Sequence, residues 1–223
     1  MVRSINALTA LMRHALALLL TLALVLPQTA SAQGISILRD AETEALFADM
    51  AEPLIRAAGL DPRNVQIVLV GNRSINAFVA GGQTVYIHSG LIEQADNANQ
   101  VQGVIAHELG HIAGGHVVRA SEGARTATGI MLLSLLLGAV AIGAGAGDAG
   151  MAALMAGQQA AMGSFLAYSR TQEATADAAG AHYLAAAGIS GRGSIEFFEK
   201  LQNLEFRYNI PQDDDQAYGR THP

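Results

Sequence analysis

The 223-residue sequence contains no cysteine. This absence excludes thiol nucleophiles, CxxC redox sites, cysteine zinc sites and lipid attachment through a cysteine. Any metal site in this chain must therefore use His, Asp or Glu. Charged residues are also few, at 14% of the chain, and acidic residues outnumber basic ones, which gives a formal net charge of -6. Without a run of basic residues, the sequence lacks the electrostatic signature of nucleic-acid binding, and we exclude nucleic acid as a partner.

Hydrophobic residues make up 51% of the chain, which is high for one soluble domain of this length. Part of this content belongs to the N-terminus, where two arginines precede the apolar run 15–26 and a small-x-small cleavage site ends at Ala32. This pattern predicts a secretory signal peptide over residues 1–32, followed by a single domain over 33–223. The alternative is an uncleaved membrane anchor, for which the apolar run is short.

Apolar spacing and turn residues predict a mainly helical α+β domain. Gly81 and Gly82 separate the two short predicted strands 77–80 and 84–88, which indicates a hairpin. The expected helices cover 41–58, a segment that begins at Asp96 or Asn97, a segment after Arg170, and about 194–208, and the expected strands cover 65–70, 77–80 and 84–88.

Residues 107–111 form the motif HExxH on a predicted amphipathic helix. Positions four apart lie on one helix face, so His107 and His111 can occupy adjacent corners of a zinc tetrahedron. Glu108 projects beside them toward the open position, where it can take a proton from metal-bound water. The motif predicts a zinc site, which still needs a third protein ligand.

Two arrangements could supply that ligand. A metzincin needs a third histidine six residues after the second, but His116 follows His111 by five, which argues against this class. The other arrangement uses a carboxylate from a later helix: Glu173 can complete the ligand set, and Asp177 can accept the free ring N–H of a ligating histidine. A solvated acidic face is the alternative interpretation of Glu173 and Asp177, but the upstream HExxH and the apolar surroundings favour the metal site.

The HExxH motif and the later SRxxExxAD motif at 169–177 resemble those of the M48 family of zinc metallopeptidases. Residues 75–91 are similar to the family's "NAF...GG...GL" hairpin, and 221–223 to its "THP" element. The resemblance extends from about Asp40 to the end of the chain. Within the family it is to a secreted bacterial branch concerned with outer-membrane protein quality, which implies a zincin-like metallopeptidase fold and a periplasmic location.

The resemblance implies that His107, His111 and Glu173 hold one zinc ion, that Glu108 is the catalytic base, and that Asp177 supports a ligand. It also implies that the THP histidine, His222, can approach the zinc as a fourth ligand or as a plug at the water position. The alternative is that His222 is a terminal residue without such a role. In that branch the chain continues into a repeat domain, which we expect to be absent here.

Several further residues are weaker candidates. The peptidase chemistry needs an oxyanion donor besides the metal, and three residues could provide it: Arg170, His182 and Tyr183. The segment of Asn76, Ala77 and Phe78 could bind an extended substrate by main-chain hydrogen bonds, or could be an ordinary hairpin strand. His116 could orient the end of the HExxH helix, although interaction with the helix dipole is the commoner role of a histidine at a helix end.

Residues 126–169 form a hydrophobic insert. Its first part, 126–147, is uncharged and long enough as a helix to cross a bilayer. His111 and Glu173 flank the insert and must reach one zinc ion, so the chain has to return to the same side. A hairpin that crosses twice would leave Gln158 and Gln159 in hydrocarbon. We therefore expect an apolar hairpin that covers the active-site cleft or contacts a membrane surface.

These observations predict a secreted zinc metalloendopeptidase that hydrolyses unfolded or misassembled envelope polypeptides, with Glu108 as base. One alternative is a zinc-bound chaperone or adaptor with a plugged active site, whose apolar insert holds unfolded clients. Another is a membrane-embedded protease with the same chemistry. Glu108 favours an enzyme, because a purely structural zinc site has no need of this carboxylate.

Overall fold

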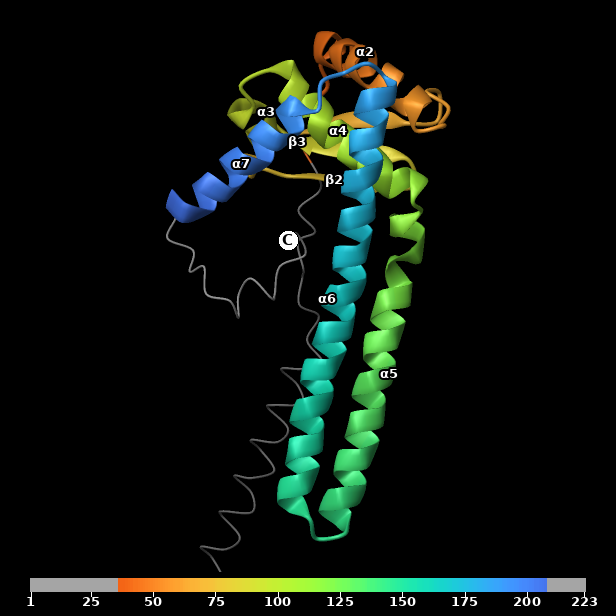
Figure 1. The fold of residues 1–223 in the computed structure, drawn as a ribbon, viewed down its shortest axis with the longest axis vertical. Helices are drawn as coiled ribbons and strands as arrows, with labels where there is room; N and C mark the ends of the chain where they lie inside the picture. Colours follow the sequence, from red (N-terminus) through yellow and green to blue (C-terminus); the bar gives the residue numbers. More distant parts are fainter. Residues whose placement is uncertain (1–35, 208–223) are drawn as a thin grey trace, which may run out of the picture. The chain divides into compact units, whose positions relative to one another are not determined.

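The computed structural model describes residues 36–207, with side chains as far as Leu201 (Figure 1). The predicted signal peptide and His222 lie outside the described residues. Within them the structure contains six helices and three strands, which confirms the mainly helical α+β class. The elements are α2 (Ala41–Ala57), β1 (Gln66–Val70), β2 (Ala77–Ala80), β3 (Thr84–His88), α3 (Ser89–Gln94), α4 (Ala98–Ala113), α5 (His116–Gly143), α6 (Gly147–Ala186) and α7 (Arg192–Arg207).

The sheet has the strand order β1-β3-β2. β2 and β3 pair antiparallel and confirm the predicted hairpin, whose turn places Gly81 and Gly82 at positive φ angles of 62° and 98°. β3 also pairs with β1, in parallel. Within residues 36–207, β2 therefore lies at an edge of the sheet, with no strand on its other side.

The first helix, α2, begins where the sequence predicts. Asp40 caps it, because its carboxylate accepts a hydrogen bond of 3.0 Å from the backbone N–H of Thr43. Pro53 lies within α2 but does not divide it, and the helix continues to Ala57. Its buried face contributes Phe47 and Leu54 to the hydrophobic core.

Helix α4 runs through the centre of the core. Asn97 caps it by accepting a hydrogen bond of 3.1 Å from the backbone N–H of Gln100. Ile105 and Leu109 are fully buried among side chains of α2, the sheet, α6 and α7. This packing fixes α4 along its length, and with it the HExxH residues that it carries.

Helices α5 and α6 form an antiparallel hairpin (Figure 1). The chain enters it at Gly115 and turns between the helices at Gly145, both at positive φ. The helix predicted after Arg170 does not begin there, because α6 is one continuous helix of 40 residues that starts at Gly147. Two glycines of α6, Gly150 and Gly157, lie against α5, Gly157 next to Ser134.

Candidate metal centre

The site forms where α4 packs against α6. The two helices approach closely because Gly180 on α6 lies against the backbone of α4. A Cβ atom added at Gly180 would lie 3.0 Å from the backbone nitrogen of His107. The side chains of His107 and His111 from α4 and of Glu173 from α6 meet at this contact. The residues predicted from distant parts of the sequence are therefore brought together.

Three donor atoms from these residues surround one point. Nε2 of His107 and Nε2 of His111 are 3.0 Å apart, and Oε2 of Glu173 lies 3.3 Å from the first and 3.5 Å from the second. Ligand atoms that bind one zinc ion tetrahedrally at 2.0–2.1 Å are separated by about 3.3 Å. The observed spacing fits such a set, and two histidines with one carboxylate are a usual donor combination for zinc.

Asp177 orients one of these histidines. Its Oδ1 atom lies 2.7 Å from Nδ1 of His107, which leaves Nε2 of that ring facing His111 and Glu173. Burial lowers the pKa of His107, but hydrogen bonds with Asp177 and Glu173 outweigh it and raise the pKa to about 9. A carboxylate behind a ligating histidine fixes its tautomer and strengthens it as a donor.

His116 holds the second histidine in the same way. Its Nδ1 lies 3.0 Å from Nδ1 of His111, and its Nε2 lies 3.2 Å from the hydroxyl of Thr175. Burial lowers the pKa of His116, which favours a neutral ring whose Nδ1 can accept a hydrogen bond from Nδ1–H of His111. His116 is the first residue of α5 and follows the end of α4 at Ala113, so the structure supports the interpretation in which it orients the end of the HExxH helix through His111.

Thr175 is a further residue of the site that was not predicted from the sequence. Its only signal is its position two residues after Glu173, which is a poor guide because most helical threonines are simply exposed. In the structure the Thr175 hydroxyl donates to the carbonyl of Gln172 at 2.8 Å and can accept from His116. A hydrogen-bonded chain thus runs from His111 through His116 to Thr175.

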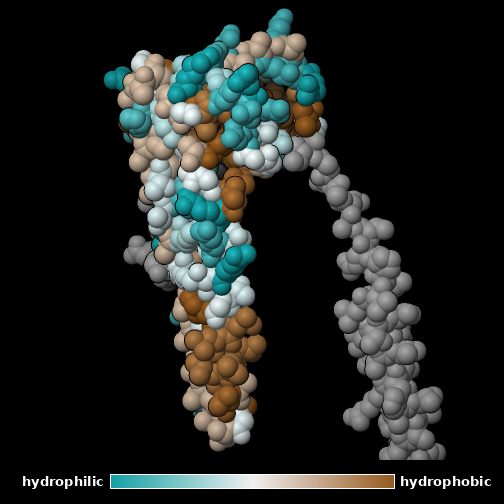
Figure 2. Space-filling view, turned by 90° about the vertical axis from the view of Figure 1, so that its right-hand side faces the viewer, coloured by the Kyte–Doolittle hydropathy of each residue, from teal (hydrophilic) through white to brown (hydrophobic). Residues whose placement is uncertain are grey.

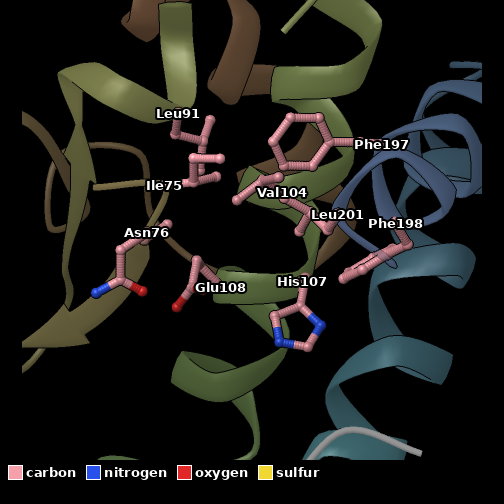
Figure 3. A pocket seen from close by; sticks show the side chains of 10 residues that line it. Ile75, Asn76, Leu91, Val104, His107, Glu108, Phe197, Phe198 and Leu201 are labelled. Carbon is pink, nitrogen blue, oxygen red and sulfur yellow. The ribbon is translucent and has the colours of Figure 1, made fainter. Parts of the chain in front are cut away.

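Glu108 lies beside the three donor residues and is buried. Burial raises the pKa of its carboxyl group. The carboxylate faces a pocket that it shares with Asn76 (Figure 3). The rest of the pocket is mostly apolar and is lined by Ile75, Ala77, Leu91, Val104, His107, Phe197, Phe198 and Leu201.

Two phenylalanines of this pocket come from α7, which the sequence analysis treated only as a final helix. Phe197 is buried in the core, and the ring of Phe198 lies 6.2 Å from that of His107. Among the residues described around the pocket, none belongs to 126–169. The expectation that the insert covers the cleft is therefore wrong for this pocket; residues 126–169 instead belong to a hairpin that extends away from α4 and the sheet (Figure 1).

The weaker candidates separate into two groups. Asn76 and Ala77 line the pocket next to Glu108, whereas the ring of Phe78 stacks on Tyr86 at 5.1 Å. The three oxyanion candidates do not line the pocket: His182 is exposed, Tyr183 packs partly against the core, and Arg170 is half-buried on α6.

Comparison with known proteins extends these observations. The family model described as Peptidase family M48 matches residues 38–223. The chain is 31% identical over 140 residues to a putative beta-barrel assembly-enhancing protease of Vibrio cholerae, covering 63% of this chain and 28% of the relative. The beta-barrel assembly-enhancing protease of Escherichia coli is 31% identical over 133 residues, or 60% of this chain and 27% of that protein.

A shorter relative is the metalloprotease LoiP of Escherichia coli, which is 32% identical over 147 residues, or 65% of this chain and 53% of LoiP. The chain thus spans about a quarter of the length of the beta-barrel assembly-enhancing proteases and about half of LoiP.

Proposed function

Because the chain belongs to peptidase family M48, and is thus a metallopeptidase by family, we propose that it is a zinc-dependent endopeptidase with Glu108 as its base. One observation carries this proposal: three donor atoms of His107, His111 and Glu173 lie 3.0–3.5 Å apart next to a buried carboxyl group. A structural zinc site would be closed by a fourth protein ligand, whereas a catalytic site keeps a position open for water or substrate.

The chemistry is hydrolysis of a peptide bond. Zinc held by the three donors supplies a positive charge that polarises the scissile carbonyl and makes water more acidic. Glu108 accepts a proton from the attacking water as its oxygen bonds to the carbonyl carbon. The same carboxyl group then gives this proton to the leaving amine nitrogen as the C–N bond breaks. Burial raises the pKa of the Glu108 carboxyl group, and a more basic carboxylate is a better acceptor for the proton of the attacking water.

We further propose that the substrates are unfolded polypeptides. β2 lies at the edge of the sheet and leads into the pocket at Asn76 and Ala77, so an extended chain can pair with β2 by main-chain hydrogen bonds. The apolar pocket beside Glu108 suits a large apolar substrate side chain. Folded proteins rarely offer an exposed extended segment, which favours unfolded or misassembled substrates.

The predicted signal peptide and the similarity to beta-barrel assembly-enhancing proteases support an envelope location, and we propose the periplasm. Misassembled envelope proteins would then be the physiological substrates.

The test compares three forms of the full chain: the parent, Glu108→Gln, and Glu93→Gln as a matched control in an exposed carboxylate of α3. Each form is loaded with zinc, assayed for zinc content and incubated with an unfolded protein. We expect one zinc ion per chain in all three, cleavage by the parent and by Glu93→Gln, and a loss of at least about 100-fold in Glu108→Gln.

Two other outcomes are informative. If all three forms hold zinc and none cleaves, the chaperone or adaptor alternative replaces the enzyme, and suppression of client aggregation becomes the measurement. If the parent binds no zinc, the assignment of the ligand set is wrong.

A further inference from the structure

The hairpin of α5 and α6 exposes a large apolar surface. We use the term distal hairpin for residues 131–155, which comprise the end of α5, its connection to α6 and the start of α6. Figure 2 shows hydrophobic side chains gathered on this part of the hairpin. Ten large apolar side chains there are between 46% and 65% exposed: Met131, Leu132, Leu133, Leu135, Leu136, Leu137, Val140, Ile142, Met151 and Met155.

These side chains surround α5 rather than forming one stripe. Successive helical residues point about 100° apart, so the five exposed leucines between 132 and 137 cover every direction except the one toward α6. A helix that docks on a protein keeps a polar face opposite its apolar face. An exposed helix that is apolar on all its free sides is expected in an apolar environment such as the hydrocarbon of a lipid bilayer. By length and composition, α5 is the helix among the described residues that could cross a membrane.

The closest contact between α5 and α6 is made by small residues, in contrast to the large side chains on the exposed surface. Small residues bring the helices together, because Gly157 faces Ser134 and Gly150 lies against Gly138. Leu154 packs onto Gly138 and Ile142 onto Gly150, while the exposed leucines of α5 point outward. An added Cβ at Gly150 would lie 2.7 Å from the carbonyl oxygen of Gly138. Helix pairs in water bury their large apolar side chains between them, whereas small residues at the contact are typical of helix pairs in lipid.

The length of the apolar region indicates how deeply the distal hairpin can enter a lipid bilayer. From Met131 to Gly143 the helix rises about 18 Å, compared with about 15 Å for the hydrocarbon of one leaflet. Gln158 and Gln159 are exposed and lie next to Gly157, which faces Ser134, three residues or about 5 Å along the helix from Met131, where the distal hairpin begins. Insertion into one leaflet leaves both amides at the surface, whereas a full crossing would bury them in hydrocarbon.

The charges fit the same placement. Arg125 is exposed on α5, about 9 Å before Met131, so its long side chain can reach anionic lipid headgroups. Asp148 is the only charged residue between 126 and 169 and lies at the deep end, where a carboxylate is unfavourable. The cost of placing this one carboxylate near hydrocarbon opposes insertion, but burial of ten large apolar side chains favours it.

We propose that the distal hairpin inserts into one leaflet of a lipid bilayer, with Gln158 and Gln159 at the membrane surface. This interaction surface is separate from the pocket beside Glu108 and does not depend on the proposed peptidase activity.

The test uses a fluorophore at one position. Because the chain has no cysteine, single cysteines can be introduced at Leu136 in the distal hairpin and at Ser121 near the base of α5, and then labelled with an environment-sensitive dye. The full chain is mixed with vesicles of phosphatidylethanolamine and phosphatidylglycerol. We expect a blue shift and a several-fold rise in emission at Leu136→Cys, and neither at Ser121→Cys. The readout is local, so binding through another part of the chain would not imitate it.

Matched variants then test the cause, with the dye at Val140→Cys. Replacing Leu132 and Leu136 together by Gln should abolish the shift, whereas Val118→Gln, at an exposed valine outside the distal hairpin, should retain it. Asp148→Asn should reach half-maximal binding with at least about tenfold less lipid, because it removes the one opposing charge.

Four results would overturn the proposal. The first is an unchanged spectrum at position 136 with vesicles. The second is a shift without lipid that grows with protein concentration, which would indicate a second copy of the chain. The third is a shift that appears with an unfolded polypeptide instead of vesicles. The fourth is quenching of a label at Gly145→Cys from the vesicle lumen, which would show that the hairpin crosses both leaflets.

Discussion

Gly110 on α4 lies directly against the backbone of Ala176 on α6, so close that a Cβ atom at position 110 would lie 2.7 Å from the carbonyl oxygen of Ala176. Ala176 is flanked on its helix by Glu173 and Asp177, which both contact His107. The glycine within HExxH therefore has no chemical role of its own. It allows the helix that carries the carboxylates to approach the helix that carries the histidines.

Replacing Gly110 by Ala should separate these helices. We expect a loss of about 1–3 kcal/mol of stability, because an added methyl group in a tight contact forces backbone shifts, together with weaker zinc binding. Gly129→Ala is the control, since this helical glycine of α5 has open space around it, and the change should be neutral or slightly stabilising. Thermal unfolding and zinc titration of both variants measure the effects, and equal behaviour of the two would contradict the argument.

Asp177→Asn should weaken zinc binding by about 10- to 100-fold with little change in fold. The substitution keeps the size of the side chain but removes the charge that holds the Nδ1 proton of His107. Competition with a chromogenic chelator gives the affinity. Asp148→Asn makes the same chemical change on the same helix far from the site and should leave the affinity unchanged. An unaltered affinity in Asp177→Asn would show that this carboxylate does not support the ligand.

His116→Ala should also weaken zinc binding, by about tenfold, because His111 loses the partner of its Nδ1 atom. Thr175→Ala, one step further along the same chain of hydrogen bonds, should have a smaller effect, and Thr175→Ser should have none, since it keeps the hydroxyl group. The order of the three affinities is the result to measure. A larger effect from Thr175→Ala than from His116→Ala would contradict the proposed chain.

Zinc affinity should depend steeply on pH. The pKa of His107 in the metal-free protein is about 9, so zinc that binds below this pH must displace a proton. We expect the apparent affinity to fall roughly tenfold per pH unit below 9. Chelator competition at several pH values between 7 and 9 measures this slope, and a flat profile would exclude His107 as a ligand with a raised pKa.

The same raised pKa affects the stability of the metal-free fold. A group whose folded pKa exceeds its ordinary value stabilises the fold when protonated. The contribution of His107 is therefore complete below pH 6.5 and disappears as the pH rises to about 9. Thermal unfolding in the presence of a chelator should show this decline, and it should be smaller in Asp177→Asn.

Much of the fold and of the candidate site follows from local patterns in the sequence. Asp40 and Asn97 are caps because their side chains reach backbone groups three residues away, and the hairpin of β2 and β3 follows from two adjacent glycines. Helical spacing also places His107 with His111, since residues four apart share a face whatever surrounds the helix.

The remaining features depend on contacts between distant segments. The parallel pairing of β1 with β3 makes β2 an edge strand, and nothing in the short strands themselves encodes this order. The sequence predicts that His116 lies near the end of the HExxH helix, but it does not predict the new helix that begins after Gly115. The continuity of α6 across Arg170 is not predicted by the change from the uncharged insert to the charged segment that follows, because it depends on the packing of α5 against Gly150 and Gly157.

The uninterrupted course of α6 sets a distance. Between Gln158, at the proposed membrane surface, and Glu173, at the candidate metal centre, the helix rises about 22 Å without a break. If the distal hairpin is inserted, the rigid helix therefore holds the candidate metal centre at a fixed distance from the membrane surface. Polypeptide segments that lie flat on the membrane would be spared, and those that stand away from it by this height would be within reach.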